Sequence, residues 1–224
     1  MKRIIALVSL AVCLLLTACE SRSIGIVGGA DGPTSIFVSL KSDADKFFKK
    51  NYVNELKLPI LDVHIENPFI SGDRTLILDD TIENNLEYMV YEYYHSKISG
   101  DFSKIKDIIA ENESLKIAID NEEKQFNEGI YFNKIILDEI DVVDKEDVLD
   151  ISKNNKQKIV SQLKELGMTE FAIVEVEANV KLNEKYLSMG PQISDGDMTR
   201  YYLIGTKDNA YKIVEVYWEG FIDD

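Results

Sequence analysis

The sequence predicts an α+β protein in which N-terminal helices pack on one face of a curved antiparallel sheet. Up to about residue 126, apolar side chains recur every three or four residues, as they do along one side of a helix. Beyond residue 130, branched and aromatic residues alternate with polar ones, which is typical of strands with one buried face. Helices followed by a run of strands is the element order of α+β domains. Residues 44–224 are numerous enough to form one such domain with its own core.

The first helix is expected to begin near Ser42 and to end before Pro59. Ser42 and Asp45 have the three-residue spacing of a capping box, and proline cannot continue a helix. Residues 60–79 are expected to be extended or irregular, because Asn-Pro and Ser-Gly pairs interrupt them. The apolar side of the helix consists of Phe47, Phe48 and Tyr52.

The strongest helical pattern follows, between Asp80 and Gly100. Asp80 and Glu83 have capping-box spacing at its start, and Gly100 is a typical helix stop. Another helical stretch is expected over residues 103–126, with a break near Asn112. The apolar positions of the stronger helix are Ile82, Leu86, Met89, Val90 and Tyr93.

Strand patterns dominate the second half of the chain. The clearest pattern covers residues 170–182, where apolar side chains face one way and charged or amide side chains face the other. A short helix that ends at Gly167 precedes this strand, and Lys207-Asp208-Asn209 has the composition of a hairpin turn. The other expected strands cover residues 130–143, 200–206 and 211–219.

This order of helices and strands over residues 44–224 resembles the nuclear-transport-factor-like cone fold. The resemblance rests on the order of the elements and not on a motif. It implies that the helices cover a bent sheet and leave a pocket between the two layers.

The N-terminus predicts a location outside the cytoplasm. Two basic residues precede an uncharged run over residues 4–18, and these fifteen residues are few for a membrane-spanning helix. The stretch Leu16-Thr17-Ala18-Cys19 resembles the lipobox of bacterial lipoproteins, in which an apolar residue and two small residues precede a cysteine. The resemblance implies that the leader is removed before Cys19 and that the Cys19 sulfur carries diacylglycerol. The alternative is an uncleaved N-terminal anchor helix.

Charge and cysteine content exclude several kinds of partner. The net charge is −15, and it becomes −17 when Lys2 and Arg3 leave with the leader. This acidity argues against binding to nucleic acid or to anionic lipid, because both need basic patches. The lipid anchor is therefore the membrane contact that we expect. Cys13 also leaves with the leader, so neither a disulfide nor a cysteine metal site is expected.

The predicted organisation is a signal peptide over residues 1–18, a lipidated glycine-rich tether over residues 19–43 and a single α+β domain over residues 44–224. Within the tether, residues 24–38 have the sequence IGIVGGADGPTSIFV. This stretch resembles a signature segment of the beta subunit of sodium-pumping decarboxylases, in which the acidic residue serves sodium translocation. The resemblance implies an ion-binding role for Asp31, which occupies that position.

The sodium-pump role requires several membrane spans around the acidic residue. No second apolar run in the chain approaches eighteen residues, so the chain provides no further span. Asp31 is therefore an ion-binding candidate only in the alternative function.

The sequence predicts no catalytic residue, no metal and no cofactor. His64 and His95 are the two histidines, and each is expected to be structural or exposed. The tyrosine-rich stretch EYMVYEYYH is expected to pack on the sheet, with a role in a pocket as the alternative. Acidic residues at 138–147 and 195–197 lack the spacing of a calcium loop, and we expect a solvated face and a turn there.

These patterns predict a membrane-anchored, non-catalytic lipoprotein domain that binds a partner protein or a small ligand. Two alternatives remain, namely a relative of the decarboxylase subunit that uses Asp31 and a small pocket enzyme with the cone-like fold. A deep apolar pocket containing His64, His95 or Asp62 would favour the enzyme.

Overall fold

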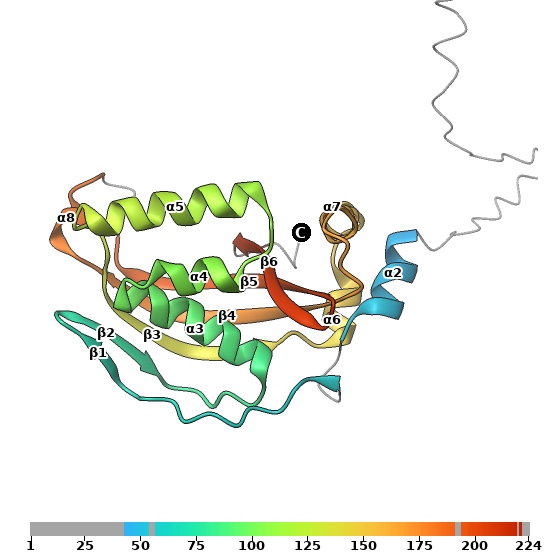
Figure 1. Cartoon of the computed structure of the whole chain (residues 1–224), viewed down its shortest axis with the longest axis horizontal. Coiled ribbons are helices and arrows are strands. Elements are labelled where there is room, and N and C mark those ends of the chain that lie inside the picture. The colour runs from blue at the N-terminus through green and yellow to red at the C-terminus, as the bar shows by residue number, and fades with distance from the viewer. Residues whose placement is uncertain (1–42, 54–56, 191–193, 219, 221–224) are drawn as a thin grey trace, which may run out of the picture. The chain divides into compact units, whose positions relative to one another are not determined.

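The computed structural model describes residues 43–53, 57–190, 194–218 and 220 (Figure 1). Residues Lys41–Asp224 form one compact unit, and its helices and strands confirm the α+β class. Within the described residues, no helix is long and apolar enough to cross a membrane. The predicted signal peptide, Cys19 and Asp31 lie outside the described residues.

Six strands form one open sheet in the order in which they occur along the chain. Neighbouring strands are antiparallel except for the second and third, which are parallel. The sequence did not predict this parallel pair, which arises because three helices connect the two strands. The strands are β1 (Phe69–Ser71), β2 (Arg74–Leu78), β3 (Phe132–Val142), β4 (Glu170–Leu182), β5 (Gly196–Lys207) and β6 (Ala210–Trp218).

Three helices cover one face of the sheet, and they lie next to one another in Figure 1. They are α3 (Asn85–Ser99), α4 (Phe102–Ile108) and α5 (Glu113–Asn127), and the predicted break at Asn112 separates the last two. Their apolar sides share a buried core with the strand residues that face them. This core includes Leu86, Val90, Ile105, Ile119, Ile135, Val176 and Tyr202.

A second group of helices packs on the opposite face of the sheet, where the sequence predicted none. Phe171 and Ile173 in β4 and Leu203 in β5 point to this face and form a second buried cluster with the helices. Both faces of the sheet are apolar at this end, so both need a cover. The helices are α2 (Asp43–Asn51), α6 (Lys145–Asp150) and α7 (Lys153–Glu165), and a short helix α8 (Glu184–Leu187) follows β4.

The predicted strand over residues 170–182 is confirmed as β4. Ala172, Val174, Val176, Ala178 and Val180 are buried against the α3–α5 layer, as their alternation required. The predicted hairpin turn between the last two strands is also confirmed. Asp208 and Asn209 adopt positive φ angles of 52° and 61° there, which a tight two-residue hairpin turn requires.

Helix ends depart from the sequence prediction at two places. The N-cap of α3 is Asn84 instead of Asp80, because the Asn84 side chain accepts hydrogen bonds from the Leu86 and Glu87 amides. The first helix ends at Asn51, well before Pro59. It ends there because the Val53 amide donates to the Phe171 carbonyl, at 2.8 Å, and Tyr52 pairs with Phe171 at the N-terminal end of β4.

Candidate ligand-binding pocket

A pocket of about 600 Å³ lies between α5, the C-terminal part of α3 and strands β4–β6. Residues of α8 and of the segment that leads into β5 complete its wall. Its volume is within the range of about 300–1,000 Å³ that is usual for small-molecule sites. The aromatic side chains of the lining are Tyr93, Tyr94, Phe102, Phe126, Tyr131, Phe132, Tyr186, Tyr202 and Trp218.

Helix α5 is attached to the sheet at both ends, and this attachment holds the pocket open. At its start, the Asn112 side chain caps α5 and also donates to the Val214 carbonyl of β6, at 2.8 Å. Beyond its end, the Asn183 side chain donates to the Gly129 carbonyl, at 2.8 Å. One asparagine at each end of α5 therefore fixes the distance between the helix and the sheet.

Three tyrosines form an edge-to-face cluster on the floor of the pocket. Tyr202 of β5 lies 5.4 Å from Tyr93 and 6.0 Å from Tyr94, between ring centroids. Burial raises the pKa of Tyr93 to about 12 and also raises the pKa of Tyr94 and Tyr202. The Tyr94 hydroxyl lies near Tyr202 but makes no hydrogen bond of normal geometry. These hydroxyls therefore remain protonated donors at neutral pH.

Lys97 and Glu122 form an ion pair that bridges α3 and α5 beside the tyrosine cluster. The Lys97 Nζ lies 2.8 Å from Glu122 Oε2 and 4.5 Å from the centre of the Tyr93 ring. The Lys97 side chain is 13% exposed, and its burial favours the neutral form. Glu122 and Tyr93 more than offset this effect, so the net shift of the Lys97 pKa is upward. Lys97 therefore carries a positive charge that Glu122 balances.

Arg200 brings a second positive charge to the pocket. Its guanidinium carbon lies 3.5 Å from the ring centre of Trp218, on the neighbouring strand. The Arg200 Nη1 donates to the Thr199 carbonyl at 2.7 Å. Trp218 is 71% exposed, so this stacked pair lies where the pocket meets solvent.

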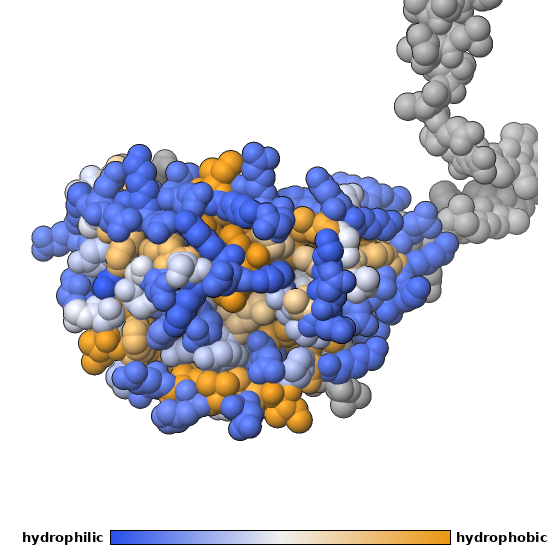
Figure 2. Space-filling model, in the orientation of Figure 1, coloured by the Kyte–Doolittle hydropathy of each residue, from blue (hydrophilic) through white to orange (hydrophobic). Residues whose placement is uncertain are grey.

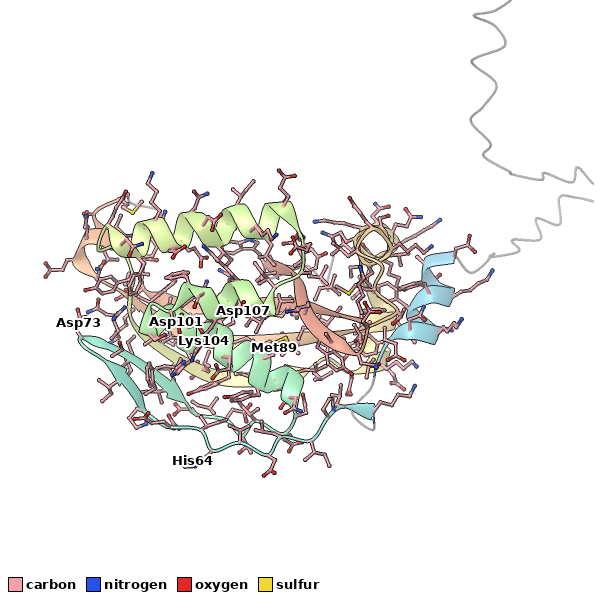
Figure 3. The ribbon with its side chains drawn as sticks, viewed as in Figure 1. His64, Asp73, Met89, Asp101, Lys104 and Asp107 are labelled. Atoms are coloured by element: carbon pink, nitrogen blue, oxygen red, sulfur yellow. The ribbon has the colours of Figure 1, made fainter. Side chains whose placement is uncertain are left out.

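The two histidines and Asp62 are not part of this pocket. His64 and Asp62 are exposed on the segment before β1, and Figure 3 shows His64 at the outer edge of that segment. His95 is half-buried on α3 and lies 4.0 Å from Phe69, between ring centroids. Burial lowers the pKa of His95. The arrangement that would favour a histidine-based enzyme is therefore not formed.

The tyrosine-rich stretch divides between two environments. Tyr93 and Tyr94 line the pocket, as the alternative role of this stretch required. Tyr88 and Tyr91 stack on each other at 6.0 Å, and the Tyr91 hydroxyl donates to the Glu66 carbonyl on the segment before β1. The helical period places these two pairs on different sides of α3.

The acidic stretches form no metal site within the described residues. Asp138, Glu139 and Asp141 are exposed, which confirms the predicted solvated face there. The turn predicted at 195–197 is wrong in part, because Gly196 and Asp197 begin β5 and pair with β4.

An exposed apolar edge lies on the opposite side of α3 from the pocket. Ile60, Val63 and Ile70 are 85%, 51% and 63% exposed. Figure 2 shows apolar side chains gathered along this edge, over the segment that runs into β1. No element of the described chain covers these three side chains.

Sequence reasoning missed Lys97, Glu122, Arg200 and Trp218. No local pattern pairs Lys97 with Glu122, because they are 25 residues apart on different helices. Arg200 did leave a signal in the sequence: it is the charged residue between Met198 and Tyr202, on the face of β5 that should be apolar. A charge at such a position is uncommon without a functional or pairing role.

Models of known protein families give no match to this chain. Comparisons with curated proteins and with solved structures give no match either.

Proposed function

We propose that this protein is a lipid-anchored, extracytoplasmic binding protein that holds a small organic ligand in the pocket between α5 and the sheet. The observation that carries the proposal is the pocket itself, about 600 Å³ in volume and lined mainly by aromatic and aliphatic side chains. Such a lining, with a few converging polar groups, is typical of small-molecule sites. The lipobox-like stretch that ends at Cys19 supports the anchor.

The placement of the polar groups favours binding over catalysis. Both histidines lie outside the pocket, and the Lys97 and Glu122 side chains form an ion pair with each other. A general base needs access to a substrate proton and a pKa near the working pH. The pKa of Lys97 is shifted upward, away from neutrality, so Lys97 is suited to holding a charge.

The proposal predicts that a bulky side chain at position 118 blocks binding. Ala118 is exposed and lies on the pocket side of α5, so Ala118→Trp narrows the entrance without disturbing the core. The probe is N-phenyl-1-naphthylamine, an uncharged fluorescent molecule with three aromatic rings. We expect the mature chain, residues 19–224 made without lipid, to bind this probe, and Ala118→Trp to weaken binding about tenfold or more, a loss of 1.4 kcal/mol or more.

Ala210→Trp is the matched control, because Ala210 is an exposed alanine at the start of β6 and does not line the pocket. Fluorescence titration gives both affinities, and thermal melting shows that each variant is folded. Equal affinity of the wild type and Ala118→Trp, or no binding by the wild type, would contradict the proposed function.

A further inference from the structure

The strand register decides which side chains enter the pocket. On β5, Met198, Arg200 and Tyr202 pair with Ala178, Val176 and Val174 of β4, which all face the α3–α5 layer. Arg200 is therefore the charged member of an otherwise uncharged row on the inner face. Its neighbour across β6 is Trp218, so the guanidinium is held flat against the indole ring.

Two acidic residues of the lining direct their carboxylates away from the interior. Asp197 pairs with Asn179 of β4 and accepts a hydrogen bond from its side chain, at 2.7 Å, on the other face of the sheet. The Glu215 carboxylate accepts hydrogen bonds from the Gln162 side chain of α7, at 3.1 Å, and from the Asn112 side chain at the start of α5, at 3.3 Å. Glu215 pairs with Leu203 of β5, whose side chain belongs to the cluster on the α7 side of the sheet. Neither carboxylate neutralises Arg200.

The third acidic group lies at the rim. The Asp195 carboxylate is exposed and accepts a hydrogen bond from the Leu182 amide, at 2.8 Å. The acidic side chain that remains inside is Glu122, which is paired with Lys97. Of the ion pairs that the described chain forms with lysine or arginine, none involves Arg200. Arg200 is therefore a positive charge of the pocket lining without an ion-pair partner among the described residues.

A buried hydrogen-bond donor lies near this charge. Tyr94 is 2% exposed, and its hydroxyl makes no hydrogen bond of normal geometry. Arg200 lies two positions before Tyr202 on the same face of β5, and the Tyr202 ring centroid is 6.0 Å from that of Tyr94. A buried hydroxyl without a partner is costly, and a ligand acceptor would remove that cost. Arg200 and Tyr94 thus offer a cation and a donor in the lining of one pocket, beside the apolar ring faces of the tyrosine cluster.

We infer that the ligand is an organic anion whose acidic group binds to Arg200 and whose ring-containing apolar body packs against Tyr94 and Tyr202. This inference rests on the proposed function, since it names the class of ligand for the same pocket. Guanidinium groups bind carboxylates, sulfonates and phosphates through paired N–H donors, and a stacked indole fixes the plane of those donors.

Two fluorescent probes with the same rings test the inference. One is N-phenyl-1-naphthylamine and the other is 8-anilinonaphthalene-1-sulfonate, which adds a sulfonate. The mature chain should bind both and should prefer the sulfonate. Arg200→Gln should weaken sulfonate binding about tenfold or more, because a hydrogen bond to a charged group is lost. The same variant should leave the affinity for the uncharged probe unchanged, and Arg200→Lys should retain part of the preference.

Lys104→Gln is the matched control for net charge. Lys104 lies on α4 outside the pocket (Figure 3), so its loss should leave both affinities unchanged. Unlabelled naphthalene-1-acetate should displace the sulfonate probe, whereas 1-naphthylmethylamine, with the same rings and the opposite charge, should not.

The outcomes separate the two proposals. If the wild type binds both probes equally and Arg200→Gln changes neither affinity, the inference is wrong and the pocket remains a binding site for uncharged molecules. If Arg200→Gln weakens both probes to the same extent, Arg200 supports the shape of the pocket instead of binding an anion, and the inference is again wrong. If the wild type binds neither probe, the proposed function fails with it.

Discussion

His95 shows at the scale of one residue how burial changes chemistry. Its ring lies against Phe69 and Tyr91, and its Nδ1 atom is buried without a hydrogen-bond partner. Desolvation is the main cause of its lowered pKa, because it penalises the charged imidazolium. Lys104 also lowers this pKa, whereas the carboxylates of Glu92, Glu66 and Asp101 oppose the shift.

The lowered pKa predicts that His95 destabilises the fold in acid. The unfolded chain binds the proton near the usual pKa of 6.5, and the folded chain binds it only at lower pH. The free energy of unfolding should therefore fall as the pH drops below 6.5, and the fall should level off once the folded chain is protonated as well. His95→Gln should remove this dependence, which urea unfolding at pH 7.5 and about pH 5 would measure.

His64→Gln is the control for this prediction, since His64 is the other histidine and is exposed. Acidic groups with shifted pKa values, such as Glu87, are common to all three proteins, so their contribution cancels in the comparison. A wild type and a His95→Gln variant with the same pH dependence would contradict the prediction.

At the scale of elements, Gly205 determines how closely α7 packs on the sheet. A Cβ atom at this position of β5 would lie 2.8 Å from Met168 Cγ and 3.1 Å from Leu163 Cδ2. Leu163 is on α7, and Met168 follows that helix. Glycine is needed here because of space and not because of its φ angle, which lies outside the left-handed region.

Gly205→Ala should destabilise the protein by about 1–3 kcal/mol, the usual cost of an extra methyl group in a packed core. Gly190→Ala is the matched control, because a Cβ atom there has no neighbour within 4 Å. Its effect should be close to zero or slightly stabilising, since alanine restricts the unfolded chain. Denaturant unfolding of both variants measures the two changes in stability. Equal stabilities would contradict the prediction, because α7 would then make room for the extra methyl group at no cost.

For the whole molecule, the predicted lipid on Cys19 decides where the domain operates. Cys19→Ser should abolish incorporation of a labelled palmitate analogue by bacteria that express the full chain, and should release the protein from the membrane fraction. Each buried CH₂ group contributes about 0.8 kcal/mol to anchoring, so loss of the acyl chains removes most of the membrane affinity.

Cys13→Ser provides the control for lipidation. Cys13 is the other cysteine of the chain and lies within the leader, so its substitution should leave labelling intact. The mass of the purified protein distinguishes the alternative at the N-terminus. A protein that retains residues 1–18 and carries no lipid would show that the leader is an uncleaved anchor.

Local patterns in the sequence predicted most of the elements. The alternation over β4, the break at Asn112 and the turn at Asp208 and Asn209 each follow from interactions between residues close in the chain. Patterns failed where a distant segment competes, as at the end of α2, where the backbone leaves the helix to pair with β4. The exposed position of His64 agrees with its prediction, and the pocket itself was anticipated only by resemblance to the cone fold.

The sequence by itself determined the α+β class and the charge that argues against nucleic acid, because these depend on composition and short-range periodicity. It did not predict the two strands before α3, β1 and β2, which lie in the segment expected to be extended or irregular. Only the tertiary structure decided the parallel pairing of β2 with β3, the second helical layer and the residues that meet in the pocket. Lys97, Glu122 and Arg200 come from two helices and a strand, and strand register alone placed Arg200 inside and Asp197 outside. Strand register and helix packing depend on contacts between residues that are far apart in the chain. A short window of the sequence therefore does not predict them.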